Sequence, residues 1–271
     1  MRTTALDALV AAFLAAPRAA GARVQIVSLG AGSDTRFFRL RARGAAAGLV
    51  YHELDFAAVT GPKVAAIVRH ALLAPGDVAL ADAAAGVLHA PAAGYYVHAL
   101  DLRALAPGCA LPPGVDAALP TLLLSECCLI YLAPGEADAI VRWAAGAFGA
   151  AVGMAVYEPI GGDDAFGRVM VQNLAARGIV LKTLKKYSSL ERQRLRFKAL
   201  GFTGGQAAAD VYFISETWVS DAEKARIAAL EMLDEVEEWR MLARHYCVAW
   251  AWRGPEFEAA WAGAFPVNTD E

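Results

Sequence analysis

The apolar positions of this chain follow two periods, one typical of amphipathic helices and one typical of buried strands. Leu6, Leu9, Val10, Phe13 and Leu14 recur at helical spacing and predict a helix at the start of the chain. Short runs of β-branched and other apolar residues predict strands. These runs cover residues 24–29, 49–54, 95–100, 151–157 and 246–252, with a near-continuous run inside 120–131 that is typical of a strand buried on both faces.

Helical patterns alternate with these predicted strands. Helices are expected over residues 35–40, 57–70 and 134–148, the last with Pro134 tolerated in its first turn. Residues 74–93 are rich in alanine and glycine and predict a loose connector. Because strands alternate with helices, the sequence favours an α/β fold with a doubly wound parallel sheet.

The pattern changes after Asp163. The expected elements are helices over 166–177, 189–200 and 220–239 and a short strand near 211–213. We interpret residues of about 160–240 as a mainly helical lobe inserted before the final strands of the sheet. No internal repeat is visible, and residues 1–271 are predicted to form one domain.

Composition narrows the classes of partner. The 271 residues are 57% hydrophobic and carry a net charge of −3 with no dominant basic patch, so nucleic acid is not an expected partner. No apolar stretch is long enough for a transmembrane helix, and the opening helix, which carries Asp7, does not resemble a signal peptide. The expected location is the cytoplasm, with the nucleus as a second one, and a monomer is expected.

The four cysteines do not have the spacing of zinc ligands. The expectation is reduced, buried thiols and no metal site. The residues concerned are Cys109, Cys127, Cys128 and Cys247.

A glycine turn follows the first predicted strand. Gly30 and Gly32 stand in the run Gly-Ala-Gly-Ser-Asp-Thr, where the absence of a side chain lets a ligand approach the backbone. The third glycine of the dinucleotide pattern is missing, which disfavours a nicotinamide-dependent dehydrogenase. The alternative interpretation is a tight turn between strand and helix with no ligand.

Polar residues also end the second and third predicted strands. Asp55 stands 25 residues after Gly30, where a carboxylate accepts hydrogen bonds from ribose hydroxyls in doubly wound folds. Asp101 is expected to meet an adenine amino group and Leu102 to pack on its ring. Arg103 offers a fork that can clamp a carboxylate, unless it is an ordinary surface arginine.

A carboxylate interrupts the apolar run within 120–131. Because an unpaired buried carboxylate is costly, Glu126 is expected to face a charged ligand group such as an α-ammonium, with a structural salt bridge as the alternative. Tyr131 offers a hydroxyl to an anionic substrate, although a lone aromatic residue more often serves packing.

Several short stretches match one family in order along nearly the whole chain. They are residues 30–40, 53–56, 101–103, 120–127 with Tyr131, 164–167, 230–235 and 244–247. Together they resemble the leucine carboxyl methyltransferase family.

That resemblance implies a class I S-adenosylmethionine-dependent methyltransferase fold, which is Rossmann-like. It also implies a substrate, the C-terminal leucine α-carboxylate of the catalytic subunit of type 2A protein phosphatases. By the same resemblance Arg103 and Tyr131 hold the substrate carboxylate. The implied contacts of S-adenosyl-L-methionine are Arg2, Gly30, Asp55, Asp101, Leu102 and Glu126.

The acceptor chemistry needs no general base. A C-terminal carboxylate has a reference pKa of about 3.3–3.7 and is already ionised at neutral pH. We therefore assign no catalytic role to any histidine, and we expect a structural role for His245.

Two further expectations come from the resemblance. Family members carry several dozen residues before the position matched by Arg2, including helices over the active site and a lysine that contacts the cofactor, so this lid segment is expected to be absent here. Rival functions are a tRNA-modifying carboxyl methyltransferase, whose added repeat domain is not seen, and a non-catalytic module that binds the phosphatase.

Overall fold

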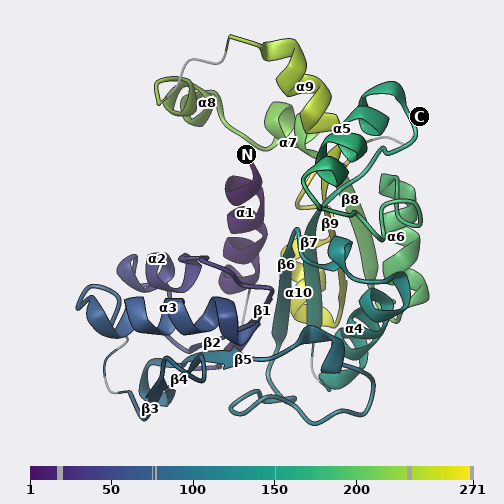
Figure 1. Ribbon diagram of the computed structural model, residues 1–271. Coiled ribbons are helices and arrows are strands. Elements are labelled where there is room, and N and C mark those ends of the chain that lie inside the picture. The colour runs from purple at the N-terminus through teal and green to yellow at the C-terminus, as the bar shows by residue number, and fades with distance from the viewer. Residues whose placement is uncertain (17–20, 75, 77, 150, 231–233, 269–271) are drawn as a thin grey trace.

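One mixed sheet of nine strands organises the protein, with helices on both of its faces (Figure 1). The computed structural model describes residues 1–16, 21–74, 76, 78–149, 151–230 and 234–268. The strands are β1 (Val24–Leu29), β2 (Leu49–Asp55), β3 (Leu80–Asp82), β4 (Val87–Ala90), β5 (Tyr95–Ala99), β6 (Thr121–Glu126), β7 (Val152–Pro159), β8 (Gly205–Asp210) and β9 (Tyr246–Arg253).

Ten helices and three single 3₁₀ turns connect the strands in the described part of the chain. The helices are α1 (Arg2–Ala15), α2 (Arg36–Ala42), α3 (Ala57–Arg69), α4 (Pro134–Ala147), α5 (Ala165–Ala176), α6 (Leu190–Ala199), α7 (Val211–Thr217), α8 (Asp221–Ala228), α9 (Val236–Arg244) and α10 (Pro255–Trp261). The 3₁₀ turns are η1 (Pro91–Ala93), η2 (Leu102–Ala104) and η3 (Leu129–Tyr131).

The strand order is β3-β4-β5-β2-β1-β6-β7-β9-β8. Neighbouring strands from β5 to β7 are parallel, whereas β9 runs antiparallel to both β7 and β8. The chain moves outward in opposite directions from β1 and β6, which makes the pair a topological switch point. In open sheets of this kind the carboxyl ends of the strands form the ligand crevice there.

The two faces of the sheet bury separate apolar cores. Alternate residues of a strand point to opposite faces, so Ile26 belongs to the core under α1, α3 and α10, and Val27 to the core under α4 and α6. Every residue of β1 is buried, as expected of a central parallel strand. Helices packed on both faces therefore hold the central strands of the sheet in place.

Several predicted boundaries were wrong for local reasons. Residues 74–93, expected as a connector, contain the short hairpin of β3 and β4, whose strands of three and four residues are too short to show a clear period. Residues 211–213, expected as a strand, begin α7, because the Asp210 carboxylate accepts the Phe213 N–H at 2.7 Å and caps the helix. The helix expected over 220–239 is the two helices α8 and α9.

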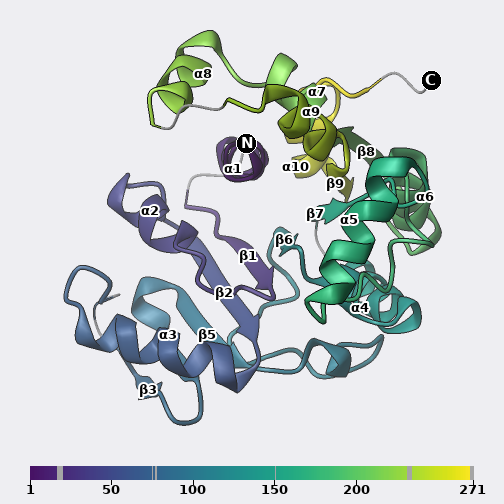
Figure 2. The ribbon, with the colours of Figure 1, turned by 45° about the horizontal axis from the view of Figure 1, so that its top comes forward.

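Two elements after α5, α6 and β8, pack against the sheet or belong to it. Phe197 of α6 lies in the core beneath the sheet, and β8 is part of the sheet itself. By contrast, α8 buries none of its residues and extends with α9 past the start of α1 (Figure 2). No helix in the described ranges is long and apolar enough to cross a membrane.

A histidine and tyrosine cluster covers part of the sheet between β2, β5 and β4. His52 Nδ1 and His98 Nε2 lie 3.1 Å apart, and Tyr96 stacks on His52 at 4.7 Å between ring centroids. Burial, with a smaller contribution from neighbouring histidines, lowers the pKa of His52 to about 3 and that of His98 to about 4. Both rings are therefore neutral in the folded protein at neutral pH.

The Phe13–Phe257 contact joins the first and last helices, and we expect it to be a major packing contribution. The two rings stack at 4.6 Å, and Phe257 also lies against Gly153, where a Cβ would meet its ring at 2.3 Å. Phe257→Ala should lower the free energy of unfolding in urea by about 3–5 kcal/mol, the usual cost of such a truncation. Leu72→Ala, at a side chain that is 97% exposed, should change it by less than about 0.5 kcal/mol.

The buried histidines should make the protein acid-sensitive. Their folded pKa values lie below the ordinary 6.5, so the unfolded chain binds more protons below about pH 6.5 and stability falls as the pH drops toward 4. Each histidine contributes a slope of up to about 1.4 kcal/mol per pH unit. His98→Phe should reduce the slope of unfolding free energy against pH between 6 and 4.5, whereas an unchanged slope would contradict the assignment.

Candidate functional site

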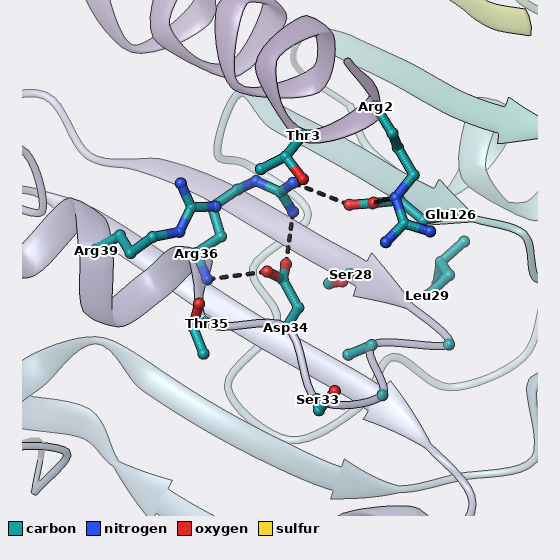
Figure 3. A pocket seen from close by; sticks show the side chains of 13 residues that line it. Arg2, Thr3, Ser28, Leu29, Ser33, Asp34, Thr35, Arg36, Arg39 and Glu126 are labelled. Carbon is teal, nitrogen blue, oxygen red and sulfur yellow. Dashed lines mark hydrogen bonds and ion pairs between the residues drawn. The ribbon is translucent and has the colours of Figure 1, made fainter. Parts of the chain in front are cut away.

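A cavity of about 360 Å³ opens where β1 and β6 end (Figure 3). Its walls come from the start of α1, the β1–α2 loop, the start of α2 and the end of β6. The lining residues are Arg2, Thr3, Ser28, Leu29, Gly30, Ala31, Gly32, Ser33, Asp34, Thr35, Arg36, Arg39 and Glu126. The cavity therefore lies at the switch point of the sheet.

The glycine turn forms one wall of this cavity. Gly30 has a φ of +64° and Gly32 a φ of +53°, a region that residues with a Cβ rarely adopt. A Cβ on Gly30 would also meet the Cys128 Sγ at 2.4 Å. The turn thus needs glycine for its conformation as well as for its closeness to the segment that follows β6.

Asp55, at the end of β2, braces this turn from outside the cavity lining. One carboxylate oxygen accepts the Gly32 N–H at 2.8 Å and the other accepts the Phe56 N–H at 2.7 Å. Each oxygen retains a second lone pair. Asp55 can therefore hold the loop and still accept a hydrogen bond from a ligand hydroxyl.

Glu126 and Arg2 meet across the cavity. Arg2 Nε lies 3.3 Å from one Glu126 oxygen, and the arginine side chain is 51% exposed. Cys127, which follows directly, has a φ of +47° and is the one non-glycine residue with positive φ in the described ranges. This uncommon conformation ends β6 and lies beside the carboxylate at the cavity.

Sequence analysis missed the residue that ties this cavity together, Arg36. Its guanidinium lies 2.9 Å from Asp7, 2.5 Å from Asp34 and 2.9 Å from Glu126, with only 2% of the side chain exposed. Burial alone would lower the pKa of Arg36, but these anions and the nearby Tyr51 raise it above its ordinary value. The fixed positive charge aligns α1, the glycine turn and β6.

The end of β5 carries an ion pair between two predicted site residues. The Asp101 carboxylate accepts hydrogen bonds from Arg103 Nε at 2.9 Å and from the Arg103 backbone N–H at 3.0 Å. This contact lowers the pKa of Asp101. Leu102, the residue between these two in the sequence, is buried, and its side chain contributes to packing. Arg103 is consequently tethered at the edge of the sheet.

Tyr131, in η3 shortly after the end of β6, is 42% exposed. Burial of its ring raises the pKa of the phenol, so the hydroxyl remains a hydrogen-bond donor at neutral pH. The turn is held by the Thr183 N–H, which donates to the Ile130 carbonyl at 3.3 Å, whereas the buried Glu158 pairs with Arg196 Nη1 at 3.3 Å.

His245 has the contacts of a structural residue. One ring nitrogen lies 2.7 Å from the Met241 carbonyl and the other 3.0 Å from both oxygens of Asp164. Asp164 also caps α5 by accepting the Gly167 N–H at 2.7 Å. The matching stretches 164–167 and 244–247 therefore meet in space, whereas residues 231–233 of the stretch 230–235 lie outside the described residues.

The structure brings all predicted cofactor residues to one edge, on α1 and at the ends of β1, β2, β5 and β6. Three of them, Arg2, Gly30 and Glu126, line the cavity, and the others lie along the edge beyond it. No hydrogen bond or ion pair joins Arg103 and Tyr131 in the described ranges. No cluster of His, Cys, Asp and Glu in those ranges has the arrangement of a metal site.

Comparisons with known proteins agree with this arrangement. The sequence profile of the leucine carboxyl methyltransferase family matches residues 1–145. The leucine carboxyl methyltransferase 1 of Emericella nidulans is 50% identical over 93% of this chain and 72% of that relative. The one of Schizosaccharomyces pombe is 41% identical over 93% of this chain and 79% of that relative.

This chain belongs to the leucine carboxyl methyltransferase family. It is therefore a methyltransferase, and S-adenosylmethionine is the methyl donor of its class. An O-methyltransferase family protein from Burkholderia thailandensis has the same fold, with a TM-score of 0.50 and 12% identity over 93% of this chain and 55% of that one. The predicted family and fold class are confirmed, whereas the roles of single residues remain predictions.

We expect replacement of Arg36 in this leucine carboxyl methyltransferase to lower the stability of the folded protein. Arg36→Met removes the charge that neutralises Asp7, Asp34 and Glu126, and breaking a buried ion network in this way costs about 3–5 kcal/mol. Urea unfolding should show this loss at pH 7. The exposed Arg43→Met should leave the unfolding free energy within about 0.5 kcal/mol.

Proposed function

We propose that this protein transfers a methyl group from S-adenosylmethionine to the α-carboxylate of a C-terminal leucine, on the catalytic subunit of type 2A protein phosphatases. The product is a methyl ester. Membership of the leucine carboxyl methyltransferase family supports the reaction class. The observation that carries the proposal is the cavity at the switch point, with Arg2 and Glu126 facing each other across it.

The paired charges fit the amino-acid end of the donor. Its α-carboxylate and α-ammonium are complementary to Arg2 and Glu126, which already attract each other at 3.3 Å. We assign the glycine turn to close backbone contact, Asp55 to the ribose hydroxyls, and Asp101 with Leu102 to the adenine.

S-adenosylmethionine supplies an electrophilic methyl group on a sulfonium centre. The acceptor carboxylate is ionised at neutral pH, so no residue of the chain needs to remove a proton. Strong stabilisation of the two opposite charges before transfer would not accelerate the step, because the charges disappear in it. The task of the residues is positioning, which can supply roughly 7–11 kcal/mol.

Arg103 and Tyr131 are assigned to the acceptor. The Arg103 fork can hold both oxygens of a carboxylate, and the Tyr131 hydroxyl can donate to one of them. The Asp101 tether limits the number of positions that the guanidinium can occupy.

The test is methyl incorporation into a phosphatase catalytic subunit. Arg103→Ala should lower turnover at least a hundredfold and leave the Kd for S-adenosylmethionine within about threefold, because its target is the acceptor. A phosphatase without its final leucine should take up no methyl group. Methylation of tRNA in place of the phosphatase, or full turnover by the Arg103 variant, would contradict the proposal.

A further inference from the structure

A second buried ion pair lies behind the glycine turn, outside the lining of the cavity at the switch point. The Glu53 carboxylate of β2 pairs with the Lys63 ammonium of α3. The Glu53 side chain is 1% exposed and the Lys63 side chain 11%, so both charges are almost out of water. Because desolvation of two charges offsets most of their attraction, stability alone does not explain such a pair.

The Lys63 ammonium also bonds to the glycine turn itself. It donates to the Asp34 carbonyl at 2.8 Å. Asp34 lines the cavity (Figure 3), and its carboxylate accepts the Arg36 backbone N–H at 3.0 Å. Lys63 thus holds the backbone of Asp34 from the side of α3, whereas Arg36 holds its side chain. One lysine therefore connects a buried carboxylate to the loop that forms the cavity.

The bond to the Asp34 carbonyl also orients the next backbone donor. No peptide bond in the described ranges is cis, and in a trans peptide the N–H points opposite to the carbonyl. Lys63 therefore directs the Thr35 N–H away from α3. Thr35 lines the cavity, and its N–H has no hydrogen-bond partner among the described residues. The lysine thus fixes an unpaired donor of the turn beside the cavity.

Glu53 can change its charge near neutral pH. Besides Lys63, the titratable groups that face it are Asp34 of the loop, Tyr95 of β5 and Tyr51 of its own strand. Burial raises the pKa of Glu53 to about 7, although Lys63 lowers it. Burial also raises the pKa of both phenols, which are therefore neutral there. Lys63 is thus the cation on which the charged form of Glu53 depends.

Loss of the charge on Glu53 would release Lys63. A buried ammonium without a counterion is costly, so Lys63 would turn to the solvent when Glu53 is protonated. Its bond to the Asp34 carbonyl would be lost with it. The glycine turn would then have no support from α3 at this point.

We propose that Lys63 is a positioning residue for S-adenosylmethionine and that Glu53 controls it, so that the glycine turn binds the donor tightly only while both members of the pair are charged. The proposal rests on the proposed function only in its assignment of the cavity to the methyl donor. Neither side chain lines the cavity, so both act through the backbone of Asp34.

Calorimetry with S-adenosylmethionine tests the pair without any acceptor. At pH 8 Lys63→Met should raise the Kd about tenfold, because the turn is no longer held in its binding conformation. Lys63→Arg keeps the charge and should restore the Kd to within about threefold of the wild-type value. The control Lys198→Met removes an exposed lysine of α6 and should change the Kd less than about twofold.

Urea unfolding of the same variants separates positioning from a structural role. If Lys63→Met lowers the unfolding free energy but leaves the Kd within about twofold of the wild-type value, the lysine only stabilises the fold and the proposal is overturned.

The pH dependence of the Kd is a readout that a merely structural lysine would not move. Only the fraction with charged Glu53 binds tightly, so the wild-type Kd should fall by up to about tenfold from pH 6 to pH 8. Glu53→Gln keeps the side-chain volume and should bind weakly at both pH values. The amino group of the donor also titrates in this range, but it affects both proteins equally. Parallel pH profiles of wild type and Glu53→Gln would contradict the proposal.

Turnover separates this proposal from the function on which it rests. With the phosphatase subunit, Lys63→Met should raise the KM for S-adenosylmethionine about tenfold, with kcat and the KM for the phosphatase within about twofold. If the wild type does not methylate the phosphatase but the Kd values follow the expected pattern, the acceptor is wrong and the role of Lys63 stands. If the wild type methylates it and both variants match its Kd, the role of Lys63 fails and the function stands.

Discussion

The site depends on one guanidinium that has been taken out of water. Arg36 is held in its charged form by Asp7, Asp34 and Glu126, which come from a helix, a loop and a strand end far apart in sequence. A buried ion pair is weak evidence for net stability, because desolvation offsets most of the attraction. Its effect here is geometric: α1 and β6 can approach the glycine turn only in the arrangement that satisfies all three carboxylates.

Carboxylates also hold the backbone in position at other places around the cavity. Asp55 braces the glycine turn through its carboxylate, and Asp34 braces the start of α2 by accepting the Arg36 backbone N–H. In both places a charged side chain bonds to backbone N–H groups, which are rigid compared with side chains. The residues assigned to ligands thus stand on a backbone that other residues hold in position.

Sequence reasoning succeeded where a single physical rule determines the outcome. Buried parallel strands appear as continuous apolar runs, and their carboxyl ends share one edge of the sheet. The sequence alone therefore predicted that Gly30, Asp55, Asp101 and Glu126 lie along the same edge. It failed where partners are distant or signals are weak. The Asp7–Arg36 contact spans 29 positions with no local signature, and the strands of the β3–β4 hairpin are too short to show a clear period.

The Asp101–Arg103 ion pair bears on how the two proposed ligands would influence each other. Each member is assigned to a different ligand, and each currently satisfies the other. A molecule that engages one of them weakens the tether and leaves its partner freer to bind. By linkage the influence must be mutual and equal in free energy. Donor and acceptor would then bind cooperatively through two residues that follow one strand, β5.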